Sequence, residues 1–276
     1  MGSAISTETS SGESGFLGSR PGLVATAVLI AAAIGTAFIG SGALFGTPVA
    51  EAAGGWLDED STWLAPASAA FRIWSAIYLG LVAYGVWQFL PAAKNARHRA
   101  ARAWILAGVL LNSVWLWVVQ AGWLSLSVLV IAALLACLCR VLVILERTRP
   151  ENWSERIVLD GVQGLYLGWV AIAAITNVAA WLGSLGWAGE PLGPIPWTIV
   201  MLVAATLVGV ALAVYTRGRF APSLALAWGL TWVAVGRAGG TALESTTVAI
   251  TAGSAAVVVL MATVLCWWLS RHHDER

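Results

Sequence analysis

Residues 124–145 read LSLSVLVIAALLACLCRVLVIL and contain a single charged residue, Arg140. An α-helix needs about 20 predominantly apolar residues to cross the hydrocarbon core of a bilayer, so this stretch predicts a transmembrane helix. Similar apolar runs lie on both sides of it, near residues 22–46, 69–92, 101–121, 157–183, 195–215, 221–237 and 245–270. The sequence therefore predicts an all-α fold, a polytopic bundle of eight transmembrane helices.

The overall composition agrees with a surface embedded in lipid. Of the 276 residues, 59% are hydrophobic and only 11% are charged, whereas soluble domains carry about 25% charged residues. A soluble chain of this length would have too few charges to cover its exterior, so lipid must cover most of it. The net charge of +1, without a long basic stretch, excludes nucleic acid as a partner.

The chain divides where its composition changes. Residues 1–21 are rich in Ser, Gly, Thr and Glu and predict a disordered N-terminal tail. The first apolar run follows a long acidic leader, which is a poor signal peptide, so we interpret the run as a helix of the mature protein. We expect a five-helix transmembrane domain at 22–187, a three-helix transmembrane extension at 188–270 and a cytoplasmic tail at 271–276, with Gly and Pro marking the internal break.

Positive charge alternates between successive loops. Basic residues gather around Lys94, Arg147 and Arg217 and in the C-terminal tail, whereas the intervening loops are acidic or nearly uncharged. Of the 15 Lys and Arg residues, only Arg72 and Arg237 fall on the other side. Because cytoplasmic loops retain Lys and Arg, both termini are predicted to be cytoplasmic.

Titratable side chains at membrane depth are scarce. The three Cys residues lie within apolar runs and are interpreted as small core residues. We expect His98, His272 and His273 in solvated loops or the tail, and Asp160 and Arg72 as solvated anchors near helix ends. The sequence thus predicts no metal-binding cluster, and no general base or nucleophile inside the bundle.

Seventeen Trp residues are an unusually large number for a chain of this length. Those near predicted helix ends are expected in the belts at the membrane interfaces: Trp56, Trp63, Trp104, Trp153, Trp267 and Trp268. Others lie deeper in the apolar runs and need a different explanation: Trp74, Trp115, Trp117, Trp169 and Trp181.

Residues 165–181, LYLGWVAIAAITNVAAW, combine aromatic and polar side chains. At about 3.6 residues per turn, Tyr166, Trp169, Asn177 and Trp181 fall within one broad face of a helix. An Asn side chain in hydrocarbon is costly unless its amide is hydrogen-bonded, so this face should point inward.

Two other helices carry similar pairs, Asn112 with Trp115 and Trp74 with Tyr78. Two interpretations stay open. The Asn side chains can form hydrogen bonds between helices, while the Trp rings fill the interior of the bundle. Alternatively, the three stripes line a flat, aromatic-walled cavity for a large planar apolar ligand. Residue types and spacing alone do not separate the two.

The three motifs resemble, in order and on the expected helices, those of the TspO/MBR family of tryptophan-rich sensory proteins. The resemblance covers about residues 23–185. Family members have several prolines ahead of the second-helix Trp, whereas this chain has only Pro66 there. The last three helices have no counterpart in five-helix members. The chain therefore resembles a divergent relative with a C-terminal extension. The motifs are Trp74-Ser-Ala-Ile-Tyr78, Asn112-x-x-Trp115, and Tyr166-x-x-Trp169 followed by Asn177 and Trp181.

The resemblance implies a membrane protein, in a bacterial inner or plasma membrane, that binds a planar hydrophobic ligand for sensing or transport. The ligand would be a tetrapyrrole such as protoporphyrin or haem, or a similar lipophile, and no cofactor is required. Membrane lipid and this small molecule are the expected partners, and a homodimer stays open. The implied binding residues are Trp74, Tyr78, Asn112, Trp115, Tyr166, Trp169, Asn177 and Trp181.

Two alternative functions remain. The first is an enzyme that degrades porphyrin in light, with Trp side chains as electron donors; it is the less favoured because the sequence offers no acid, base or nucleophile at depth. The second is a permease or structural membrane subunit, which inverted repeats or paired broken helices would favour.

Overall fold

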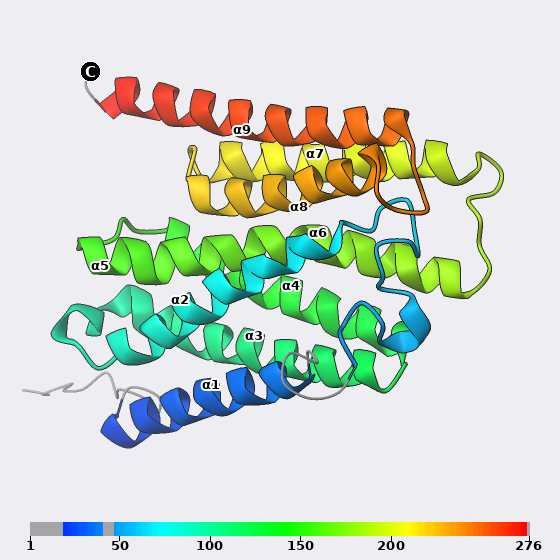
Figure 1. Ribbon diagram of the computed structural model, residues 1–276. Coiled ribbons are helices and arrows are strands. Elements are labelled where there is room, and N and C mark those ends of the chain that lie inside the picture. Colours follow the sequence, from blue (N-terminus) through cyan, green and yellow to red (C-terminus); the bar gives the residue numbers. More distant parts are fainter. Residues whose placement is uncertain (1–18, 41–46, 275–276) are drawn as a thin grey trace, which may run out of the picture.

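The computed structural model describes residues 19–40 and 47–274, and these form an all-helical bundle (Figure 1). Its long helices are α1 (Arg20–Gly40), α2 (Ile73–Trp87), α3 (Ala96–Gln120), α4 (Leu124–Glu146), α6 (Val162–Ser184), α7 (Pro194–Tyr215), α8 (Phe220–Ala238) and α9 (Thr246–Asp274). The short segments are η2 (Ala53–Gly55), η3 (Ser68–Arg72), η4 (Pro91–Ala93), α5 (Trp153–Glu155) and the π-helix η5 (Arg156–Gly161). Nearly all of the predicted N-terminal tail lies outside the described residues.

Eight long helices occur where the apolar runs predict them, and seven of these are long and apolar enough to cross a membrane. The chain is therefore an integral membrane protein. Among the described helices, α8 falls short of the hydropathy of a span, because its 19 residues include Arg237 and two Trp side chains. That α8 crosses the membrane stays a prediction.

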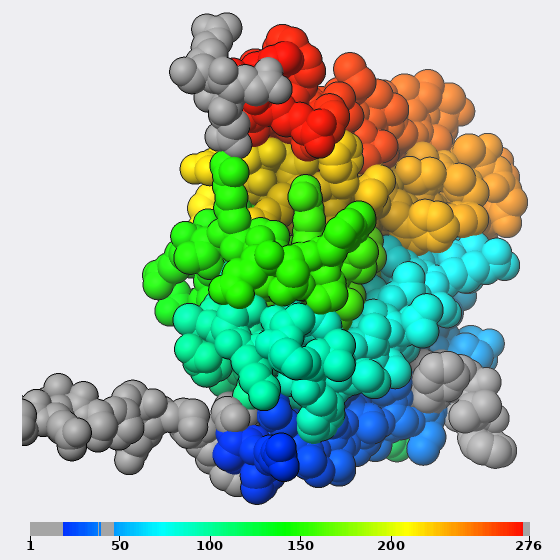
Figure 2. Space-filling view, turned by 90° about the vertical axis from the view of Figure 1, so that its left-hand side faces the viewer, coloured from blue at the N-terminus to red at the C-terminus, as the bar shows by residue number. Residues whose placement is uncertain are grey.

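Successive long helices run in opposite directions, and α6 lies at the centre of the bundle (Figure 1). α6 packs against α4 on one side and α8 on the other, while α1 packs on α3 and α9 on α8 and α7. Figure 2 looks along the bundle at the end where α1 begins and α9 ends. We call it the basic end, because it carries the loops with Lys94, Arg147 and Arg217.

Glycines bring α6 and α8 into backbone contact. A Cβ at Gly168 would lie 2.0 Å from the carbonyl oxygen of Pro222, and one at Gly229 would lie 2.6 Å from the side chain of Ile172. Small residues allow such close approach between helices in membranes, where van der Waals packing drives their association. The three C-terminal helices thus pack directly on the five-helix part.

The prediction that His98 is solvated is wrong. α3 begins at Ala96, earlier than the apolar run suggested, and the imidazole is fully buried. Its Nε2 lies 2.9 Å from Tyr84 Oη and its Nδ1 lies 2.9 Å from the carbonyl oxygen of Ala93. His272 is exposed, as predicted, and the side chain of His273 lies outside the described part of the chain.

The prediction that Asp160 is a solvated anchor is also wrong. Asp160 belongs to the π-helix, and its side chain is only 6% exposed. The carboxylate forms ion pairs with Arg97 from α3 and with Arg219 from the turn between α7 and α8. Arg97 also bonds Glu155 at 2.8 Å. These partners are far apart in sequence, so spacing could not reveal them. Arg72 is exposed, as expected.

The cysteines are all free thiols, and they differ in position. Cys137 is buried, as predicted, whereas Cys139 is exposed on the outer face of α4 and is not a core residue. Within residues 19–40 and 47–274, no group of His, Cys, Asp and Glu side chains is arranged to hold a metal ion.

Candidate functional site

The predicted aromatic residues of α2 and α6 meet inside the bundle. Trp74 stacks on Tyr78 with ring centroids 5.2 Å apart. Its ring also makes edge contacts with Tyr166 at 5.9 Å and Trp169 at 6.3 Å. Such geometries are favourable for aromatic pairs, which gain about 0.5–1.5 kcal/mol beyond the burial of their surface. We call these four residues, with Phe71 beside Trp169, the aromatic cluster.

Polar groups of α3 and α6 adjoin the aromatic cluster. The Asn112 Nδ2 donates to Tyr78 Oη at 3.2 Å, and Tyr166 Oη donates to the Gly108 carbonyl oxygen at 3.3 Å. Two buried atoms, Asn112 Oδ1 and Trp169 Nε1, have no hydrogen-bond partner among the described residues. One is an acceptor and the other a donor. Both residues line the same small cavity of about 20 Å³, together with Trp74.

Asn177 ties three helices together. Its Oδ1 accepts from Trp115 Nε1 at 2.8 Å, and its Nδ2 donates to Ser127 Oγ at 2.9 Å, so α3, α4 and α6 share one buried polar junction. This geometry supports the interpretation that Asn177 forms hydrogen bonds between helices. A role in orienting a ligand stays a prediction, because Asn177 also lines a neighbouring cavity.

Trp181 lies apart from the other predicted residues. Its indole is half-buried, donates to Ser125 Oγ at 3.1 Å, and is not among the residues that line the two cavities near the aromatic cluster. The structure thus brings together seven of the eight predicted residues and places Trp181 nearer the end of α6. Trp117, also predicted at depth, is 48% exposed on the outside of the bundle.

The loop between α1 and α2 covers a second cavity of about 40 Å³. From the loop and η3 come Trp56, Leu57, Ser61, Thr62, Ala65, Pro66 and Phe71; from α3 and α6 come Trp115, Trp169, Ile172, Ala173, Thr176 and Asn177. The sequence predicts Trp56 for an interfacial belt, and its ring packs against the last residues of α6, where a Cβ at Gly183 would lie 2.9 Å from it. Irregular loops have no hydrophobic period, so residues 47–72 gave no signal of this covering position.

The C-terminal helices hold this loop in place. The Ala67 backbone N–H donates to the Trp232 carbonyl oxygen at 3.1 Å, and Trp228 Nε1 donates to the Ala70 carbonyl oxygen at 2.9 Å. Arg237, which is 1% exposed, donates to the carbonyl oxygen of Glu59. α8 therefore forms part of the site indirectly, by fixing the segment that covers the cavity.

The two cavities are small in this conformation. Pockets that enclose a drug-sized ligand measure roughly 300–1,000 Å³, and one water occupies about 30 Å³. Phe71, Trp115, Trp169 and Ala173 line both cavities, so the two cavities adjoin. A large planar ligand would need these side chains and the covering loop to move outward.

Residues 23–265 match the model of the family described as TSPO-like protein, so this membrane-embedded helical bundle belongs to the TSPO-like protein family. No curated protein and no solved structure matched the chain. The matched region continues beyond Ser184 through α7 and α8 and into α9, so it includes helices that the sequence resemblance, ending near residue 185, left outside.

Proposed function

We propose that the protein binds a planar hydrophobic ligand, a tetrapyrrole or a similar lipophile, at the aromatic cluster beneath the loop between α1 and α2. The observation that carries this proposal is that Asn112 and Trp169, which line one aromatic-walled cavity, each have a buried polar atom without a hydrogen-bond partner, Oδ1 and Nε1. An unpaired buried polar atom costs roughly 1–3 kcal/mol. A ligand that carries both a donor and an acceptor would remove this cost.

The surroundings of the pair favour a flat apolar ligand. Trp74, Trp115 and Trp169 present rings from three helices, and aromatic walls with a few convergent polar groups are typical of small-molecule pockets. Ligand binding would merge the two cavities, since Phe71 and Trp169 stand between them. Residues 56–71 would then act as a cover that opens to admit the ligand.

Binding for sensing or transport fits the cavities better than catalysis. Among the described residues that line them, none carries a carboxylate, an imidazole, an amine or a thiol. The hydroxyls of Ser61, Thr62 and Thr176 line the second cavity, but a hydroxyl becomes an effective nucleophile only beside a general base, and the described lining residues offer none of the usual ones. Light-driven degradation of porphyrin by Trp side chains would not need one, and it is therefore an outcome to be tested.

We also propose that all eight long helices cross the membrane, with the basic end cytoplasmic. α8 runs antiparallel to α7 and α9, and its 19 residues extend about 28 Å at 1.5 Å each, close to the roughly 30 Å of the hydrocarbon core. The segments with Lys94, Arg147 and Arg217 all lie at this end, as expected for cytoplasmic loops.

Titration of the purified protein with protoporphyrin, followed by the Soret absorbance, tests the ligand proposal. Trp169→Phe keeps an aromatic ring but removes the unpartnered N–H, so affinity should fall roughly ten- to a hundredfold. Trp117→Phe is the matched control on the exposed face of α3 and should bind as the wild type does. Equal affinity in all three proteins would refute the site, and a new absorbance spectrum after illumination would indicate the enzyme.

A further inference from the structure

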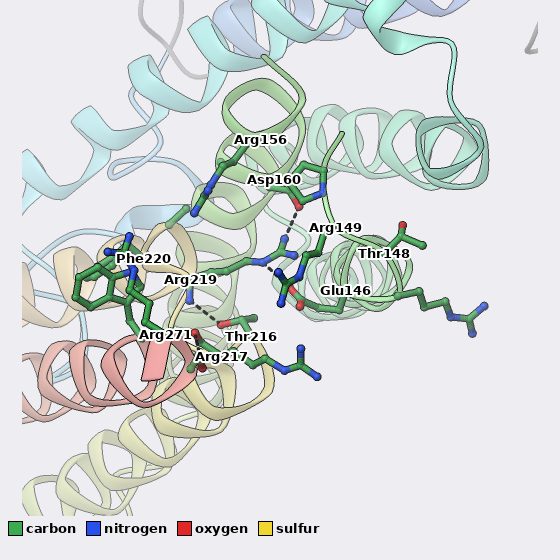
Figure 3. A pocket seen from close by; sticks show the side chains of 17 residues that line it. Glu146, Thr148, Arg149, Arg156, Asp160, Thr216, Arg217, Arg219, Phe220 and Arg271 are labelled. Atoms are coloured by element: carbon green, nitrogen blue, oxygen red, sulfur yellow. Dashed lines mark hydrogen bonds and ion pairs between the residues drawn. The ribbon is translucent and has the colours of Figure 1, made fainter. Parts of the chain in front are cut away.

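A large cavity of about 780 Å³ lies at the basic end, away from the aromatic cluster (Figure 3). Its walls come from the end of α4, the π-helix before α6, the turn between α7 and α8, and the last turns of α9. It shares no lining residue with the two cavities at the aromatic cluster. Figure 2 looks onto this end, where the green segments of α4 to α6 face the yellow and red segments of α7 to α9.

The lining is strongly basic. Its arginines outnumber its carboxylates by six to two, and both carboxylates, Glu146 and Asp160, are already engaged inside the protein. Arg219 forms an ion pair with Glu146, with Nε 2.9 Å from Oε1, and Asp160 is shared between Arg219 and the buried Arg97. The six arginines are Arg147, Arg149, Arg156, Arg217, Arg219 and Arg271. Among the described residues of the lining, arginines therefore outnumber carboxylates, and the wall carries an excess of positive charge.

Three of the six arginines, Arg217, Arg219 and Arg271, project from the tightly packed turn between α7 and α8 and from α9. Gly218 has φ +81, and a Cβ there would lie 2.2 Å from the backbone nitrogen of Trp267, so the turn between α7 and α8 fits tightly against α9. This contact sets Arg217 and Arg219 on either side of the glycine. Arg271 lies over the Trp267 ring, with its guanidinium carbon 4.1 Å from the ring centroid. A site with pre-positioned charges loses less entropy on binding than a mobile one.

We propose that this cavity binds a phosphate-bearing anion, and that the headgroup of an anionic phospholipid is its source. Guanidinium groups match the oxygen geometry of phosphate in bidentate fashion. Basic pockets between transmembrane helices at the membrane surface favour anionic lipid headgroups. Phe220 and Trp267 add apolar surface beside the arginines, which suits the glycerol and first methylenes of a lipid. An ordinary basic loop would supply charge but neither the enclosure nor the apolar wall.

The test measures lipid affinity of the full chain in neutral detergent, by thermal stabilisation during titration with phosphatidylglycerol, cardiolipin or phosphatidylcholine. Arg217→Gln combined with Arg271→Gln removes two lining charges that make no ion pair with a carboxylate in the described residues. The matched control, Lys94→Gln combined with Arg99→Gln, removes two exposed charges at the same end but outside the cavity. Circular dichroism of each variant, followed during heating without added lipid, reports whether its fold is intact.

The wild type should be stabilised saturably by the two anionic lipids and not by phosphatidylcholine. The cavity variant should bind the anionic lipids at least tenfold more weakly than the wild type does, and at least tenfold more weakly than the control variant does. Competition by glycerol phosphate or inorganic phosphate at lipid-like affinity would support the phosphate site but assign it to a soluble ligand. Equal losses in the two variants, or no stabilisation by any of these compounds, would overturn the proposal.

Discussion

Replacing Gly168 by Ala would place a methyl group 2.0 Å from the carbonyl oxygen of Pro222 and 3.0 Å from the Cβ of Ala225. Ordinary contacts of a Cβ begin at 3.4 Å, so α6 and α8 must separate by about 1.4 Å, the difference between 3.4 Å and the 2.0 Å to Pro222. Overpacking a well-packed interior costs about 1–3 kcal/mol, and the upper end applies here because the obstacle is backbone. The melting temperature should fall on the order of 10 °C.

Circular dichroism in detergent, followed during heating, measures this effect. The matched control is Gly85→Ala in α2, where a Cβ meets nothing within 4 Å. Ala is the better helix former by about 1 kcal/mol, so this control should melt at or slightly above the wild-type temperature. If Gly168→Ala melts at the same temperature as the wild type and Gly85→Ala, α8 does not lie against α6 as described. In that case α8 would not be placed to hold the covering loop.

Two further predictions concern the polar junction and the topology. Asn177→Leu removes the acceptor for Trp115 Nε1 and the donor to Ser127, so the free energy of unfolding should fall by about 1 kcal/mol and the melting temperature should fall slightly. Protoporphyrin affinity should fall about tenfold. Wild-type affinity would show that Asn177 is a purely structural group. Reporter fusions after Glu190 and Glu244 should lie on one side of the membrane and a fusion after Lys94 on the other. Opposite sidedness of the first two would show that α8 does not cross.

The helices and their inward faces could be predicted because their signals are local. Apolar runs of bilayer-spanning length gave the positions of all eight long helices, and the spacing of Trp74 and Tyr78, or of Tyr166 and Trp169, indicated which side chains share a face. The structure brings these four rings into one cluster. Family membership, predicted from the same residues, is confirmed by the match over 23–265.

The sequence did not predict features that depend on distant partners. Asp160 is buried because Arg97 reaches it from α3 and Arg219 from the turn between α7 and α8. His98 is buried beside Tyr84 of α2. The loop before α2 has no periodic pattern, so neither its place over the cavity nor its attachment to α8 could be read from spacing. Trp181 lies about 120° around α6 from Trp169, at the other edge of the predicted face, and its indole bonds Ser125 of α4 and does not line the cavities.

The hold of α8 on the covering loop also offers the most direct test of the proposed binding site. A Cβ at Gly236 would lie 3.6 Å from the Cβ of Ala67, which suits a disulfide, whose Cβ atoms are usually about 3.5–4.5 Å apart. Ala67→Cys combined with Gly236→Cys would lock the loop to α8. The single variants control for the native thiols.

The decisive measurement is protoporphyrin affinity of this double variant, oxidised and then reduced. If the ligand enters beneath the loop, the oxidised protein should bind at least tenfold more weakly than the wild type, and reduction should restore binding. The single variants should bind normally under both conditions. Wild-type affinity in the locked protein, with the disulfide verified by mass spectrometry, would contradict a site that opens by movement of this loop.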